Sequence, residues 1–125
     1  MPSALDVVTE FIAAFVAAWP QRDAASLRRF FRDDAVYCNG PLPPVEGGDS
    51  IIETITEFMQ MGGDVDVDLV HVLSDGLIVM TERIDRFRKD GATASMPMMG
   101  ILEVRDGAIA AWRDYFDLAQ FTTQL

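Results

Sequence analysis

Three short turn sequences divide the second half of the chain, and this division limits the folds that the chain can adopt. Each turn contains an aspartate followed by a glycine, which is typical of tight hairpin connections. From Asp64 onward, aspartates alternate with valine and leucine, as in a strand with one solvated face. We therefore expect a strand from Asp64, followed by strands 77–88, 93–104 and 108–116, with turns at Asp75-Gly76, Lys89-Asp90-Gly91 and Arg105-Asp106-Gly107.

Helical spacing dominates the first half of the chain. We expect a first helix that is capped by Ser3 and ended by Pro20, and a short second helix capped by Asp23. A capping box formed by Ser50 and Glu53 predicts the start of a third helix. The expected apolar stripe of the first helix consists of Leu5, Val8, Ile12, Phe15 and Trp19.

The order of these elements indicates the α+β class. Helices come first, then one strand at 35–39, another helix, and four strands joined by tight turns. This order predicts a curved, mixed but mostly antiparallel sheet with about three to four helices over its concave side. At 125 residues, half of them hydrophobic, we expect a single domain spanning residues 1–125.

Composition narrows the classes of partner. The formal net charge of −10 argues against nucleic acid, because affinity for phosphates requires basic side chains. No uncharged apolar run approaches the roughly 20 residues of a membrane helix, so we expect no membrane insertion. The start of the chain lacks a signal-peptide pattern, and the single cysteine, Cys38, permits a cytoplasmic location, which we therefore expect. No second metal ligand accompanies the only histidine, His71, and we expect no metal site.

Arg83 and Asp85 are the first candidates for chemistry. They alternate along one strand, so both point to the same face, which also carries Val79 and Phe87. Taken alone, such a pair is more often a structural ion pair on a surface. Charges on an apolar face are costly unless they are paired, however, and they often mark a functional pocket.

Two other segments supply polar side chains to the faces that we expect to point inward. Tyr37 and Asn39 alternate on the early strand, and Asp114 lies on the last strand. The face of Asp114 also carries Trp112 and Phe116, and Met98 is a candidate for an adaptable apolar wall. The predicted apolar lining of this substrate pocket is therefore Val79, Phe87, Met98, Trp112 and Phe116.

If Asp85 and Asp114 flank Arg83, the three side chains can act as an acid and a base. With both carboxylates ionised the group carries one net negative charge, so in an apolar pocket we expect one carboxylate to hold a proton. A guanidinium can bind both carboxylates at once. The result is a general acid and a general base at one site, beside a water that Tyr37 and Asn39 could hold. Such a site is suited to opening an epoxide with water, which requires no metal, cofactor or covalent intermediate.

Three sequence blocks together resemble the limonene-1,2-epoxide hydrolase family. They are Tyr37-Cys38-Asn39 with the prolines at 41–44, Glu82-Arg83-Ile84-Asp85, and Trp112-Arg113-Asp114-Tyr115-Phe116-Asp117. The resemblance spans nearly the whole chain. It implies the curved cone fold shared with nuclear transport factor, ketosteroid isomerase and SnoaL-like cyclases, and it implies a homodimer.

The resemblance also implies roles for individual residues. Asp114 would be the base that activates water, Tyr37 and Asn39 would position that water, Asp85 would be the acid, and Arg83 would bridge both acids. The expected partners are a small or medium-sized apolar epoxide and water, and no cofactor. Two alternatives stay open on the sequence alone: another enzyme of the same fold, such as an isomerase or polyketide cyclase, and a module that binds a hydrophobic ligand without turnover.

Overall fold

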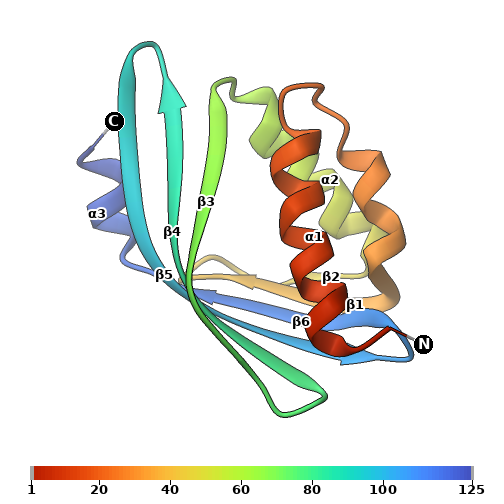
Figure 1. Ribbon diagram of the computed structural model, residues 1–125. Helices are drawn as coiled ribbons and strands as arrows, with labels where there is room; N and C mark the ends of the chain where they lie inside the picture. Colours follow the sequence, from red (N-terminus) through yellow and green to blue (C-terminus); the bar gives the residue numbers. More distant parts are fainter. Residues whose placement is uncertain (1, 125) are drawn as a thin grey trace.

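A six-stranded sheet forms the framework of the protein in the computed structural model, which describes residues 2–124 (Figure 1). The strand order is β2-β1-β6-β5-β4-β3. Neighbouring strands are antiparallel except β1 and β6, which pair in parallel. The strands are β1 (Phe31–Asn39), β2 (Val45–Glu46), β3 (Asp64–Ser74), β4 (Ile78–Lys89), β5 (Ala92–Arg105) and β6 (Ala108–Tyr115).

Helices cover the side toward which the sheet bends, as Figure 1 shows for α1 and α2. Within the described residues the helices are α1 (Ala4–Ala18), a 3₁₀ helix (Ala24–Phe30), α2 (Gly48–Gln60) and α3 (Leu118–Thr122). The predicted α+β class with a curved, mostly antiparallel sheet is confirmed, and the sheet does not close on itself. None of these helices has the length and apolar character needed to cross a bilayer.

The predicted hairpins lie where the turn sequences indicated. Gly76, Asp90 and Asp106 all adopt positive φ angles, as tight turns of this kind require. These turns fix the register: β4 and β5 pair over almost their full lengths, and β6 pairs with the second half of β5, with one irregularity between Glu103 and Val104. This register brings residues from three strands to one place on the concave face.

The helix starts and faces differ from some of the predictions. The capping box is wrong: α2 begins at Gly48 with Gly47 as its N-cap, and Ser50 lies inside the helix. Asp23 does cap the second helix by accepting a hydrogen bond from the Ser26 backbone N–H, but that helix is 3₁₀. Leu5 is 42% exposed, because the buried face of α1 is rotated toward Val7 and Phe11.

The core between α1 and the sheet is rich in aromatic rings. Phe11 of α1 packs edge-on against Phe30, Phe31 and Trp112, with ring centroids 5.2–5.5 Å apart. Such contacts add to the free energy gained by burying the rings. They hold α1 against β6, so that one end of the core opens onto the polar residues of the concave face.

The sequence did not predict α3. Asp117 caps this helix by accepting hydrogen bonds from the backbone N–H groups of Ala119 and Gln120. After the helix, the Gln124 side chain accepts from the Ser95 N–H and donates to the Ser95 carbonyl, both at 2.9 Å. This pair of bonds fastens Gln124 to the first half of β5. Ser95 lies before Met99, the residue of β5 at which pairing with β6 begins.

Candidate active site

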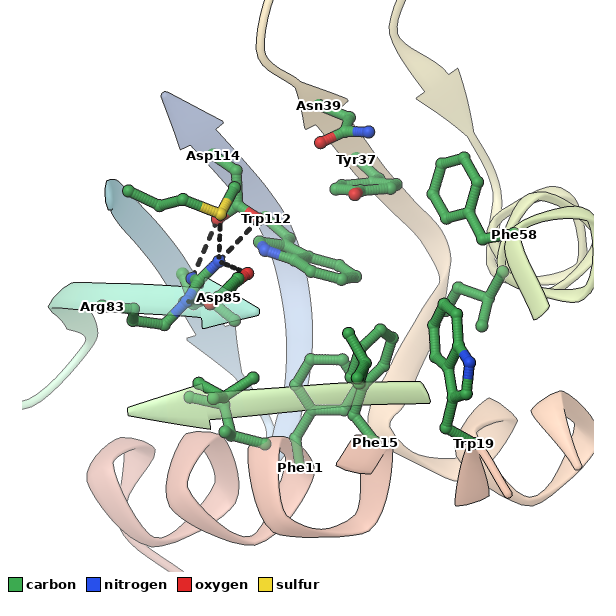
Figure 2. Close-up of a pocket in the computed structure, with 16 residues that line it drawn as sticks. Phe11, Phe15, Trp19, Tyr37, Asn39, Phe58, Arg83, Asp85, Trp112 and Asp114 are labelled. Carbon is green, nitrogen blue, oxygen red and sulfur yellow. Dashed lines mark hydrogen bonds and ion pairs between the residues drawn. The ribbon is translucent and has the colours of Figure 1, made fainter. Parts of the chain in front are cut away.

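Arg83 joins two carboxylates that come from different strands (Figure 2). Its Nε and Nη2 donate to the two oxygens of Asp85 at 3.1 and 3.0 Å. Its Nη1 and Nη2 also donate to the two oxygens of Asp114, both at 3.0 Å. Asp85 lies two residues along the same strand, whereas Asp114 lies on β6, so the guanidinium reaches across β5.

A glycine of the intervening strand makes this reach possible. Gly100 on β5 is in register with Thr81 of β4 on one side and with Asp114 of β6 on the other. A Cβ atom at Gly100 would lie 2.5 Å from Arg83 Nη1 and 2.7 Å from Asp114 Oδ1. Thr81 completes the row by accepting a 3.3 Å hydrogen bond from Arg83 Nη1. Sequence reasoning missed Gly100 and gave Thr81 no role.

Burial sets the electrostatics of the group. Arg83 and Asp114 are 5% and 3% exposed, while the Asp85 side chain keeps 25% exposure. Burial raises the pKa of Asp114 above its ordinary value, and the charge and hydrogen bonds of Arg83 offset part of that rise. Burial also disfavours the charged form of Arg83, but the two carboxylates outweigh it and raise the pKa of the guanidinium. Arg83 is therefore always charged, and the Asp114 carboxylate is a stronger base than that of an ordinary, exposed aspartate.

Tyr37 and Asn39 lie beside the carboxylate on the neighbouring strand. The parallel register of β1 and β6 pairs Tyr37 with Trp112 and Asn39 with Asp114. The Tyr37 and Trp112 rings stack, with centroids 4.0 Å apart and planes 20° apart. Burial, together with the charge of Asp114, raises the pKa of Tyr37 well above its ordinary value, so the hydroxyl stays a neutral donor.

Trp112 carries the one buried side-chain nitrogen or oxygen that has no hydrogen-bond partner in residues 2–124. Its indole Nε1 lies on the same face of β6 as Asp114, two residues earlier. It forms no hydrogen bond of good geometry with the Asp114 carboxylate, yet its N–H lies close enough to lower the pKa of that carboxyl group. A buried donor of this kind is costly unless something in the cavity accepts from it.

Apart from Gly100 and Thr81, these residues all border one cavity of about 150 Å³. Figure 2 shows aromatic side chains from α1, α2, β1 and β6 around the space in front of the Arg83 cluster. The five predicted polar residues, namely Tyr37, Asn39, Arg83, Asp85 and Asp114, all line this cavity. The structure thus brings together side chains that are up to 77 positions apart in the sequence, from Tyr37 to Asp114.

The predicted apolar lining is divided between three places. Met98 and Trp112 line the cavity, and Met98 also accepts a weak hydrogen bond from Arg83 Nη2 at 3.5 Å. Phe87 and Phe116 line a second, adjoining cavity instead. Val79 lines neither cavity: it is fully buried in the hydrophobic core, which corrects its assignment to the substrate pocket.

The arrangement supplies a proton donor and a proton acceptor at fixed positions in an apolar space. One guanidinium and two carboxyl groups are neutral together when one carboxyl group is protonated, and this is the less costly state in a dry cavity. Tyr37, Asn39 and Trp112 add neutral hydrogen-bonding groups beside Asp114. Such a set can remove a proton from a bound water while it gives a proton to a second molecule.

Sequence comparison gives two findings of the same kind. The family model described as limonene-1,2-epoxide hydrolase catalytic domain matches residues 4–125. Epoxide hydrolase EphG of Mycobacterium tuberculosis is 33% identical over 109 residues, which cover 86% of this chain and 71% of that protein.

Comparison with solved structures gives similar proteins of the same kind and of the same fold. An LEH-like epoxide hydrolase from M. tuberculosis superposes with a TM-score of 0.75 at 31% identity, over 94% of this chain and 90% of that one. A SnoaL-like polyketide cyclase from Shewanella putrefaciens gives a TM-score of 0.78 at 17% identity, over 93% and 83% of the two chains. The latter likeness concerns the fold alone, and it confirms the predicted cone fold.

Proposed function

The chain belongs to the limonene-1,2-epoxide hydrolase family and is an epoxide hydrolase, and we propose that it adds water to a small or medium-sized apolar epoxide in one step. The observation that carries this proposal is the Arg83 guanidinium, which binds both Asp85 and Asp114 at the wall of an apolar cavity. The product would be a vicinal diol. The family assignment favours this activity over the isomerase, cyclase and ligand-binding alternatives.

In the proposed mechanism, Asp114 is the general base and Asp85 the general acid. The water donates one proton to Asp114 and one hydrogen bond to the Asn39 side-chain oxygen, and it accepts from the Tyr37 hydroxyl, which leaves one lone pair for attack. As the new C–O bond forms, the ring C–O bond breaks and Asp85 gives its proton to the ring oxygen. The proton gained by Asp114 then returns to Asp85, which restores the starting state.

The environment of each carboxyl group supports these roles. A base is more effective when its pKa lies nearer to the working pH, and burial raises the pKa of Asp114. Asp85 is more exposed, and it lines both this cavity and an adjoining one, so an epoxide bound there can take a proton from it. Because acid, base and water suffice for this chemistry, we propose that no cofactor takes part, and we expect full activity after treatment with EDTA.

The direct test is the replacement of each carboxyl group by an amide. We expect Asp114→Asn and Asp85→Asn each to lower kcat by at least about 10³-fold, because each removes one proton transfer. Circular dichroism checks that both variants keep the fold. Near-normal turnover by either variant would refute the assignment.

A single turnover in ¹⁸O-labelled water separates this mechanism from a covalent one. We expect the label to appear in the diol at once. Label that entered the protein first would mean that a carboxylate had attacked the ring, and the assignment of Asp114 as a general base would then be wrong.

We also propose that the protein is a cytoplasmic homodimer that uses the outer face of the sheet. Exposed apolar side chains collect there in two cross-strand rows. Leu73 of β3 pairs with Met80 of β4, and Met99 of β5 pairs with Tyr115 of β6. All four are exposed, and exposed apolar side chains gathered on one face are typical of a protein interface.

A further inference from the structure

A second cavity of about 220 Å³ adjoins the catalytic one. The two cavities share six lining residues, namely Trp19, Asn39, Phe58, Val65, Asp85 and Met98. Of these two cavities, Arg83 and Asp114 line the first, inner one and not the second, whereas Asp85 lines both. The proposed acid therefore lies where the inner cavity meets this second cavity, which we call the outer chamber.

The outer chamber is apolar and has a fixed outer wall. Of the described residues that line it, only Asp85 and Arg86 are ionisable, and Arg86 is already paired with Asp68. Leu118 and Phe121 of α3 contribute to the wall, and the two hydrogen bonds between Gln124 and Ser95 hold α3 in place. The chamber thus offers no free charge to a charged group and is suited to a hydrocarbon chain.

The inner cavity is too small for a medium-sized epoxide together with its water. An apolar cavity of about 150 Å³ is enough for a ligand the size of benzene. This cavity has to hold the attacking water and the oxirane ring as well as any substituent. A substrate with two substituents on the ring must therefore place the longer one elsewhere, and the outer chamber is the adjoining space beside Asp85.

We propose that the enzyme acts on internal epoxides with two apolar arms, and that the outer chamber is the binding site for the longer arm. The short arm lies in the inner cavity, the ring oxygen lies at Asp85, and the longer arm extends toward α3. This inference rests on the proposed function and adds the substrate class to it.

A series of unbranched 2,3-epoxyalkanes tests the proposal, because only one arm grows along the series. We expect kcat/KM to rise with each added CH₂, by up to about fourfold per step, which corresponds to about 0.8 kcal/mol of apolar burial. The rise should stop when the chamber is full. A value of kcat/KM that does not depend on chain length would overturn the proposal while the hydrolase activity itself stands.

Matched variants separate an effect of the chamber wall from an effect of substrate hydrophobicity in general. Leu118→Ala removes apolar surface from the chamber wall, and Leu5→Ala makes the same change at an exposed site on α1. We expect Leu118→Ala to lower the ratio of kcat/KM for long over short epoxides by roughly tenfold. Leu5→Ala should leave this ratio unchanged. Equal ratios in the two variants would overturn the proposal.

A larger side chain at the same wall gives a test that does not depend on α3 tolerating a deletion. Phe121→Trp should reduce the space in the chamber, so kcat/KM should stop rising at a shorter chain length. An unaltered length dependence would count against the chamber as the binding site. Absence of diol from every epoxide with the unmodified enzyme would instead refute the proposed function, and the inference with it.

Discussion

Two opposing effects act on the pKa of Asp114. Removal from water favours its protonated form, whereas the guanidinium of Arg83 and the N–H of Trp112 favour the carboxylate. An aspartate in this position can accept a proton from water more readily than an exposed one, provided that it remains ionised at the working pH. The same balance has a measurable effect on folding.

We expect Asp114 to make the stability of the protein depend on pH. Its pKa is raised in the folded state, so the folded state binds this proton more tightly than the unfolded chain does. The resulting stabilisation is complete below the unfolded pKa of about 4 and is lost as the pH rises through the folded pKa. Urea unfolding of the natural protein and of Asp114→Asn, from pH 4 to 8, measures it. The free energy of unfolding of the natural protein should fall relative to the variant as the pH rises, and a constant difference would contradict the raised pKa.

The indole N–H of Trp112 should lower the pKa of Asp114 in the working enzyme. Trp112→Phe removes this donor, which favours the charged form of Asp114, so we expect the acidic limb of the kcat profile to move up by at most roughly one pH unit. Trp19→Phe is the matched control, because its N–H already donates to the Gly63 carbonyl at 3.0 Å. Its acidic limb should not move. Identical profiles for the two variants would show that the Trp112 N–H has no influence on Asp114.

At the scale of elements, β5 determines whether side chains of β4 and β6 can contact each other. Arg83 and Asp114 lie on strands that are not neighbours, and Gly100 leaves the gap between them open. Positioning of this kind is demanding, since a displacement of about 1 Å at a reacting group can lower a rate about 100-fold.

We therefore expect Gly100→Ala to lower kcat/KM by about 100-fold or more while the sheet still forms. The new methyl group would occupy the space where Arg83 Nη1 and Asp114 Oδ1 now meet. Steady-state kinetics and thermal melting measure the two effects. Gly91→Ala, in a turn with open space around it but a positive φ angle, controls for general destabilisation. Equal loss of activity in both variants would mean that strain, and not the site, explains the effect.

The strands also show what the sequence could and could not predict. Alternation assigned Arg83, Asp85 and Asp114 to inward faces, because side chains on a strand have a period of two. The turn sequences correctly ordered β3 to β6. Gly100 and Thr81 could not be identified, since their importance depends on which residues of three strands lie side by side. The helix α3 was missed because its five residues are too few for a helical pattern to be recognised.

At the scale of the whole molecule, the outer face of the sheet should decide the oligomeric state. We expect the natural protein to be a dimer in analytical ultracentrifugation, because burial of Leu73, Met80, Met99 and Tyr115 removes apolar surface from water. Met99→Glu should shift it toward the monomer, since a charge would be buried at the interface. Leu5→Glu, a similar change on the exposed side of α1, should not. A monomeric natural protein at micromolar concentration would contradict the proposal.

Because Thr81, Gly100 and Asp114 must lie side by side on three strands, catalytic turnover also depends on the correct pairing of these strands. If β5 paired with its neighbours two residues out of step, a methionine or leucine would replace the glycine, and the strands could still give a normal circular dichroism spectrum. Such a misaligned chain would be inactive. The turnover recovered after refolding would therefore measure the fraction of molecules in which the strands pair in the native register. Circular dichroism alone does not distinguish these molecules from misaligned ones.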